Sequence, residues 1–174
     1  NETGAIFPVE EAARAIRRSK APALLHVDAV QAFGKLPFTV KKLGADLLTL
    51  SGHKLHAPKG VGALYVKKTT RLLPRTLGGG QERGLRSGTE SVPLIGALGE
   101  AVRLLPPAGE ALEHIQKLNS LLRQELAQLP GVVLHSPEDA LPYVLNFSAG
   151  KVRGETMLHF LAQREVYVSS GSAC

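Results

Sequence analysis

The chain of 174 residues is poor in several residue types that define whole classes of protein. Its single cysteine, Cys174, rules out an internal disulfide and is typical of a protein from a reducing compartment. There is no CxxC or HExxH motif and no paired histidine spacing, so we expect no metal site. Aromatic residues make up 5% of the chain and no stacking motif accompanies the charges, which disfavours a nucleic-acid groove.

Long hydrophobic runs and targeting segments are missing as well. No stretch approaches the roughly 18 apolar residues of a membrane span, and no signal peptide opens the chain. We therefore expect a cytoplasmic protein with no membrane partner. Because the chain lacks an initiator Met and stops in a Ser/Gly-rich loop, we also expect it to be an internal fragment of a longer protein.

What the chain does contain is typical of a globular protein. Hydrophobic residues make up 44% of it, which is enough for a buried core, and the net charge is +6. We interpret this charge first as a solvated basic surface. A site for an anionic cofactor or an acidic protein partner is a second interpretation, and direct nucleic-acid binding is the weakest.

Hydrophobic spacing and turn residues predict an α/β region followed by a smaller α+β region. Pro106-Pro107 separate the two, and the apolar spacing over 109–129 is the strongest helix signal in the chain. We expect helices over 8–20, 93–105, 109–129 and 154–165, a short connection or helix turn over 38–44, and strands over 23–28, 46–50, 61–66, 131–135, 143–148 and 166–169.

Two of these strands end in residues that carry chemistry. The first ends in Asp28, and the second is followed by Lys54. The carboxyl ends of parallel strands form the edge of a sheet where ligands bind. An amine that can form a Schiff base and an acid that can hold a pyridinium proton are the minimum equipment of an enzyme that uses pyridoxal phosphate. Taken singly, Lys54 could be a solvated lysine and Asp28 a cap at a strand end.

The neighbours of these two residues favour the cofactor interpretation. Ser51 and His53 offer a hydroxyl and an imidazole to a phosphate, and Gly52 lets the backbone approach closely. Gln31 could donate a hydrogen bond to a ring oxygen of the cofactor, or be an exposed polar residue.

Two further segments have both a functional and an ordinary interpretation. The Gly-rich residues 77–89 form either a flexible surface loop or an anion-binding lid that uses Arg83, Arg86, Ser87 and Thr89. Cys174 ends a loop of small polar residues, which indicates an exposed and mobile thiolate nucleophile, although a lone cysteine is most often an incidental thiol.

Several motifs together resemble those of the cysteine desulfurases, in order and spacing along the whole chain. These are fold-type I pyridoxal phosphate enzymes of the class V aminotransferase group, and the Gly-rich segment and the C-terminal loop are similar to the NifS/IscS-type branch rather than the SufS-type branch. The motifs are Asn1-Glu2-Thr3-Gly4, His26-Val27-Asp28-Ala29-Val30-Gln31, Ser51-Gly52-His53-Lys54, the segment 78–89, Leu145-Asn146-Phe147-Ser148 and Ser169-Ser170-Gly171-Ser172-Ala173-Cys174.

The resemblance implies a domain organisation. Residues 1–107 would be the C-terminal part of a large domain with a mostly parallel sheet and helices, which binds the cofactor. Residues 108–130 would be a connecting helix, and residues 131–174 the start of a small α+β domain that ends in the loop of the catalytic cysteine.

The resemblance also implies a role for each residue that matches a motif. Lys54 would hold pyridoxal phosphate as a Schiff base, and Cys174 would attack the sulfur of the L-cysteine substrate. The products would be L-alanine and a persulfide on Cys174, which passes sulfur to an acceptor such as an iron–sulfur scaffold or a tRNA-thiolation protein. The other cofactor-binding residues would be Asp28 at the pyridinium nitrogen, Gln31 at the ring hydroxyl, Asn1 near that oxygen, Ser51 and His53 at the phosphate, and Thr89 at the phosphate of the neighbouring subunit of a homodimer.

The chain departs from the family pattern in ways that limit these implications. The family's ring-stacking histidine, its Gly/Thr phosphate turn and its arginine for the substrate carboxylate have no counterpart here, and His56-Ala57 replace another residue followed by Gly. We therefore predict that the 174 residues alone do not turn over cysteine. Two alternatives stay open: another class V enzyme, such as an aminotransferase or a selenocysteine lyase, and an inactive truncated product. Cys174 disfavours the aminotransferase, which needs no thiol.

Overall fold

The structure is a computed structural model that describes residues 1–171, without the side chains of residues 108–110. By its internal contacts the chain forms two compact units. One unit is Pro8–Gly109, and the other combines Asn1–Phe7 with the chain from Glu110 onwards. Among the described residues, no helix is long and apolar enough to cross a lipid bilayer.

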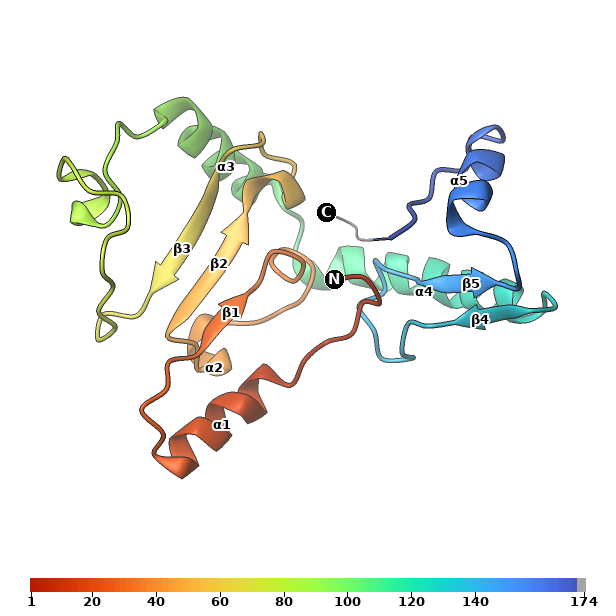
Figure 1. Cartoon of the computed structure of the whole chain (residues 1–174), viewed down its shortest axis with the longest axis horizontal. Helices are drawn as coiled ribbons and strands as arrows, with labels where there is room; N and C mark the ends of the chain where they lie inside the picture. The colour runs from red at the N-terminus through yellow and green to blue at the C-terminus, as the bar shows by residue number, and fades with distance from the viewer. Residues whose placement is uncertain (172–174) are drawn as a thin grey trace. The chain divides into compact units, whose positions relative to one another are not determined.

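The unit Pro8–Gly109 is built around a sheet of three strands, β1 (His26–Asp28), β2 (Leu47–Ser51) and β3 (Gly62–Val66). Figure 1 shows β2 lying between the other two. Strands β1 and β2 are parallel, with His26 opposite Leu47 and Asp28 opposite Thr49. Leu47 and Leu48, at the start of the central strand β2, are buried, whereas most of the β3 side chains are exposed.

The sheet is mixed, since β3 runs antiparallel to β2. The mostly parallel sheet implied by the family resemblance is therefore only partly seen within this unit. The reason is the length of the connection. Ten residues separate β2 from β3, which is too few for the crossover that a parallel neighbour requires.

The helices of this unit follow the sequence pattern closely. Helix α1 (Val9–Ser19) begins after Pro8, has acidic residues in its first turn and ends at Lys20, whose φ of 53° is left-handed. It packs on the short helix α2 (Val40–Leu43) through the buried Ala13. The remaining helical segments are the 3-10 turns η1 (Gly52–Lys54) and η2 (Gln81–Gly84) and the helix α3 (Val92–Leu104).

The second unit contains helix α4 (Ala108–Ala127), the antiparallel strands β4 (Val132–Leu134) and β5 (Phe147–Ala149), and helix α5 (Gly154–Ala162). The N-terminal segment is attached here, because the Leu141 amide donates to the Gly4 carbonyl at 2.8 Å. Arg123 on α4 donates to the carbonyls of Ser136 and Pro137, at 3.0 and 2.6 Å. These bonds tie the helix to the segment between the two strands.

Two strand predictions in this unit are wrong. Residues 166–169 have no regular structure, and of the segment 143–148 only the end, from Phe147, is strand. A strand persists only where a neighbour accepts its backbone hydrogen bonds, and within residues 1–171 no strand pairs with residues 166–169. Tyr167 accordingly remains 81% exposed. The predicted helices over 8–20, 93–105, 109–129 and 154–165 are confirmed to within three residues at each end.

Candidate functional site

The parallel pairing of β1 and β2 brings the predicted cofactor residues to one edge of the sheet. Asp28 is the last residue of β1 and lies opposite Thr49 in β2. The Ala29 amide continues the pairing by donating to the Thr49 carbonyl at 2.9 Å. Ser51 ends β2, two residues beyond Thr49, and Lys54 ends the 3-10 turn that follows. Both strands therefore deliver their polar ends to the same edge (Figure 1).

The turn that carries Lys54 is fixed by close packing around Gly52. The Gly52 amide donates to the Val61 carbonyl at 2.8 Å, and its carbonyl accepts from the amides of Leu55 and Ala57. A Cβ at Gly52 would lie 2.9 Å from Val61 Cγ1 and 3.0 Å from the Val61 carbonyl oxygen, so only glycine fits without a shift. Leu55, 2% exposed, anchors the other side of the turn. Lys54 is thereby held at the edge with its side chain half-buried.

Ser51 and His53 form a hydrogen-bonded pair at this edge, with 2.8 Å between Ser51 Oγ and His53 Nδ1. The direction of the bond depends on the imidazole tautomer. When Ser51 donates, Nε2–H of His53 stays available, and when His53 donates, the Ser51 hydroxyl proton stays available. In either case the pair keeps one donor for an anion, as a phosphate-binding role requires.

Asp28 is exposed and makes only local contacts within the described part of the chain. Its Oδ1 accepts a hydrogen bond from the Val30 amide at 2.9 Å, and no salt bridge to it is found among the described residues. Such an Asx turn orients the carboxylate but leaves its second oxygen for another donor. A protonated ring nitrogen is a suitable donor.

The structure adds Lys35, which sequence reasoning did not single out. Its Nζ donates to Gln31 Oε1 at 3.1 Å. Burial and the positive charge of Lys54 lower the pKa of Lys35 below its ordinary value. The available signal was a lysine four residues after Gln31, between Phe33 and Phe38 in a mostly apolar stretch.

The Gly-rich segment is an ordered loop held by its own hydrogen bonds. The Gly79 amide donates to Ser87 Oγ at 2.9 Å, and the Gly88 amide donates to Gln81 Oε1 at 3.2 Å. Arg86 donates to the Ser87 carbonyl, so part of its donor capacity is used inside the loop. Thr89 follows the loop with its side chain exposed. Its role toward a neighbouring subunit stays a prediction.

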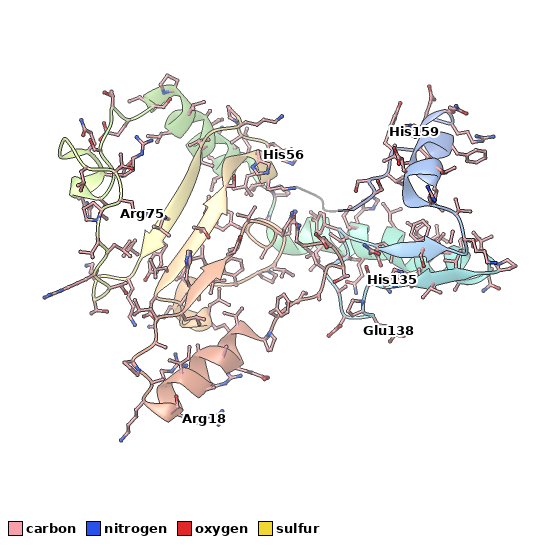
Figure 2. All side chains as sticks on the ribbon, viewed as in Figure 1. Arg18, His56, Arg75, His135, Glu138 and His159 are labelled. Carbon is pink, nitrogen blue, oxygen red and sulfur yellow. The ribbon has the colours of Figure 1, made fainter. Side chains whose placement is uncertain are left out.

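Three predicted site residues are not assigned to this edge grouping. Asn1 belongs to the other compact unit, Thr89 follows the Gly-rich loop, and Cys174 lies outside the described residues. The grouping at the sheet edge therefore consists of Asp28, Gln31, Ser51, His53 and Lys54. Figure 2 labels three histidines on separate elements, after η1, after β4 and on α5. Nowhere in the described part of the chain do three His, Cys, Asp or Glu side chains gather as a metal site would need.

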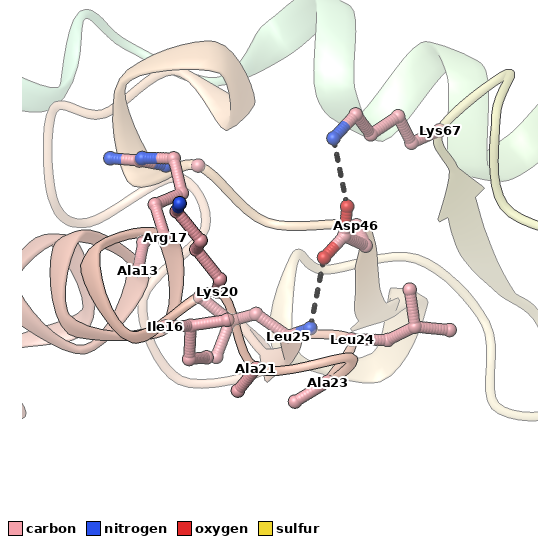
Figure 3. Close-up of a pocket in the computed structure, with 11 residues that line it drawn as sticks. Ala13, Ile16, Arg17, Lys20, Ala21, Ala23, Leu24, Leu25, Asp46 and Lys67 are labelled. Atoms are coloured by element: carbon pink, nitrogen blue, oxygen red, sulfur yellow. Dashed lines mark hydrogen bonds and ion pairs between the residues drawn. The ribbon is translucent and has the colours of Figure 1, made fainter.

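The opposite end of the same sheet contains a different charged site. Asp46, directly before β2, accepts from the Leu25 amide at 3.0 Å and from Lys67 Nζ at 2.9 Å (Figure 3). These two hydrogen bonds lower the pKa of Asp46, the one from Leu25 having the larger effect. A surface cavity of about 270 Å³ lies here, with Arg17 and Lys20 of the α1 end among its lining residues. The carboxylate is thus fully engaged by the protein.

The donor set at the first edge fits pyridoxal phosphate. The cofactor needs an amine for its aldehyde, an acid for its ring nitrogen, a donor for its ring oxygen and donors for its phosphate. Lys54, Asp28, Gln31 and the Ser51–His53 pair supply these groups in that order.

Comparison with known proteins agrees with a set of residues that fits pyridoxal phosphate. The family model described as aminotransferase class V matches residues 1–174, so the chain belongs to the class V aminotransferase family. This family, including the cysteine desulfurases, depends on pyridoxal phosphate. The fold agrees: a solved structure named NifS-like protein has a TM-score of 0.91 at 42% identity over 98% of this chain, and a NifS-like protein from Rickettsia africae has 0.90 at 32%.

Curated relatives narrow the likeness to one branch of the family. A protein named cysteine desulfurase from Nostoc sp. is 44% identical over 177 aligned residues, and one from Gluconacetobacter diazotrophicus is 45% identical. A mitochondrial cysteine desulfurase from Candida albicans is 42% identical. All of this chain is covered in each comparison, but only 44%, 44% and 36% of the respective relative. The chain therefore spans less than half the length of these curated relatives.

Proposed function

We propose that this chain contributes the lysine anchor and the nucleophilic cysteine of a cysteine desulfurase that uses pyridoxal phosphate. The observation that carries the proposal is that Asp28 and Lys54 lie at the same carboxyl edge of the β1–β2 pair. The identity to proteins named cysteine desulfurase, over the full chain, supports L-cysteine as the substrate.

When bound, pyridoxal phosphate supplies an electron sink for negative charge at the substrate α-carbon. Asp28 would keep the proton on the ring nitrogen, and Ser51 and His53 would bind the phosphate. The Lys54 amine would bind the cofactor covalently and afterwards move the proton of the substrate α-carbon. Asn1 would lie near the ring oxygen that Gln31 contacts.

Cys174 would carry out the sulfur transfer. Its thiolate attacks the substrate sulfur, so a sulfur–sulfur bond forms and the carbon–sulfur bond of cysteine breaks. The bonding electrons pass to the substrate β-carbon, which gains a proton. The net reaction converts L-cysteine and the Cys174 thiol into L-alanine and a Cys174 persulfide. A sulfur-acceptor protein, such as an iron–sulfur scaffold, would then remove the persulfide sulfur, and Thr89 would complete the phosphate site of a second subunit in a homodimer.

The test uses the full-length protein that contains this chain. It should bind pyridoxal phosphate with visible absorbance and release one alanine for each persulfide formed from cysteine. Lys54→Ala should abolish the covalent cofactor band, whereas Lys41→Ala, a change at an exposed lysine on α2, should not. Cys174→Ser should keep the band and lose persulfide formation. Unchanged persulfide formation in Cys174→Ser would refute the role of the thiol.

A further inference from the structure

The turn after β1 places a second lysine beside the proposed cofactor site. The Ala29 carbonyl accepts from the amides of Ala32 and Phe33, and the Ala32 carbonyl accepts from those of Lys35 and Leu36. These consecutive turns bring residues four apart onto one side, as in a helix. The ammonium group of Lys35 thereby reaches the side chain of Gln31, at 3.1 Å from Nζ to Oε1.

This hydrogen bond determines which way the Gln31 amide points. A lysine ammonium has three donors and no acceptor, so it can bind only the oxygen end of an amide. With its oxygen facing Lys35, the amide directs its NH₂ group away from that lysine. The donor end of Gln31 is thus the end directed away from Lys35, and the ring oxygen of the cofactor needs a donor.

The same turn is packed directly against the segment that carries Lys54. Gly34 has a φ of 76°, and a Cβ there would lie 3.0 Å from Leu105 Cδ1 and 3.3 Å from Leu55 Cδ2. Leu55 follows Lys54 and is 2% exposed. Lys35 is itself half-buried, and the charge of Lys54 acts on it. Lys35 is therefore held close to both Gln31 and Lys54.

We propose that Lys35 is a positioning residue that orients the Gln31 amide so that its NH₂ group donates to the ring oxygen of pyridoxal phosphate. The proposal rests on the proposed function, because it requires the cofactor at this edge. Lys35 acts through Gln31. The positive charge of Lys35 also favours the deprotonated form of bound pyridoxal phosphate over its protonated form. The Gln31 donor that Lys35 orients favours the same form.

The test compares variants of the full-length protein loaded with pyridoxal phosphate. Lys35→Met keeps the length of the side chain but removes the charge and the donors. It should raise the pH midpoint of the visible absorbance of the bound cofactor and weaken cofactor binding by roughly three- to tenfold, the loss of one hydrogen bond. Lys35→Arg keeps a donor and a charge and should restore most of both. Lys41→Met, on exposed α2, is the matched control and should change neither.

A second variant separates orientation from general stability. Gln31→Glu keeps an acceptor for Lys35 but has no NH₂ donor, so it should raise the midpoint in the same direction, and combination with Lys35→Met should add little. The other titratable groups at this edge, Asp28, His53 and Lys54, are the same in every variant, so differences between variants report on the Lys35–Gln31 pair.

The possible outcomes separate this inference from the function on which it rests. If Lys35→Met lowers thermal stability but leaves the absorbance midpoint and the cofactor affinity unchanged, the lysine is merely structural and the proposal is overturned. If Lys35→Met does not fold, Gln31→Glu alone decides, and an unchanged midpoint there overturns the proposal. If the wild-type protein binds no cofactor, or if Lys54→Ala keeps the covalent band, the proposed function fails and this inference fails with it.

Discussion

Asp28 and Asp46 lie at opposite ends of one small sheet, and the protein treats their carboxylates differently. Asp46 has its side chain 16% exposed and is held by the Leu25 amide and by Lys67. Asp28 is exposed, and within the described residues its carboxylate accepts a bond only from the amide two residues further along, at Val30. An acid whose two oxygens are both bound by the protein contributes to stability, whereas an acid with one oxygen left at a ligand-binding edge of a sheet can hold a ligand.

The position of each acid on its strand explains the difference. Asp28 ends β1, at the carboxyl edge where parallel strands gather ligand-binding groups. Asp46 precedes β2, and its backbone is also bonded to both neighbours: its amide donates to the Leu25 carbonyl, and its carbonyl accepts from the Lys67 amide. Asp46 therefore joins the start of β1 to the end of β3. The comparison predicts that changes at the Asp28 end of the sheet affect cofactor binding and catalysis. Changes at the Asp46 end should instead affect the free energy of unfolding.

The largest expected effect is that of Asp28→Asn on activity in the full-length protein. The amide cannot hold a proton on the ring nitrogen, so cysteine turnover should fall roughly a hundredfold or more, about 2.7 kcal/mol in activation free energy. The free energy of unfolding without the cofactor should change little, because Asp28 is exposed. The measurements are alanine release and chemical denaturation of the apo-protein. Turnover within about threefold of wild type would remove Asp28 from the mechanism.

A smaller effect should follow from Gly52→Ala, which tests whether the ligand end also depends on packing. The added Cβ would lie 2.9 Å from Val61 Cγ1 and 3.1 Å from Ala57 Cβ. Such overpacking should lower the free energy of unfolding by about 1–3 kcal/mol and displace the turn that carries Lys54. In Gly96→Ala, on α3, the new Cβ would meet no atom within 4 Å. That control should be neutral or stabilising by up to about 1 kcal/mol in urea denaturation. Equal loss in both variants would contradict the packing argument.

The sequence predicts local structure and the edge site well, for identifiable reasons. Capping charges and apolar spacing place α1 and α4 nearly residue by residue, because helices are stabilised within a few residues of chain. Asp28 and Lys54 could be predicted to lie at one edge of the sheet because parallel strands align their carboxyl ends.

What depends on distant parts of the chain could not be predicted. Tyr167 has a strand-like neighbourhood but no strand pairs with it in the described chain, and residue type alone does not provide a partner. Asp46 meets Lys67 across 21 positions, and the pairing arises from the antiparallel register of β3. Lys35 was missed because its partner Gln31 is apparent only once the turn after β1 is formed.

A more modest effect is expected for Asp46→Asn, which tests the structural end of the comparison. The variant loses the ion pair to Lys67, and its amide can still accept from the Leu25 amide. Because Lys67 is 49% exposed, the pair is partly screened, and the loss should be about 1 kcal/mol of unfolding free energy. Cysteine turnover by the folded enzyme should stay close to wild type. A large loss of turnover with unchanged stability would show that the two ends are not separate in role.

The smallest expected effect is on the pH dependence of the unfolding free energy, and the pKa of Asp46 gives its sign. The pKa of Asp46 is lowered in the folded state by the Leu25 amide and by Lys67. The unfolded chain then binds a proton more readily than the folded chain, so the stabilisation is complete above about pH 5 and is lost as the pH falls through about 3.9 towards the folded pKa. The unfolding free energy of wild type should therefore fall more steeply between pH 5 and pH 3 than that of Asp46→Asn. Equal slopes in wild type and Asp46→Asn would contradict the effect of the Leu25 and Lys67 hydrogen bonds on this carboxylate.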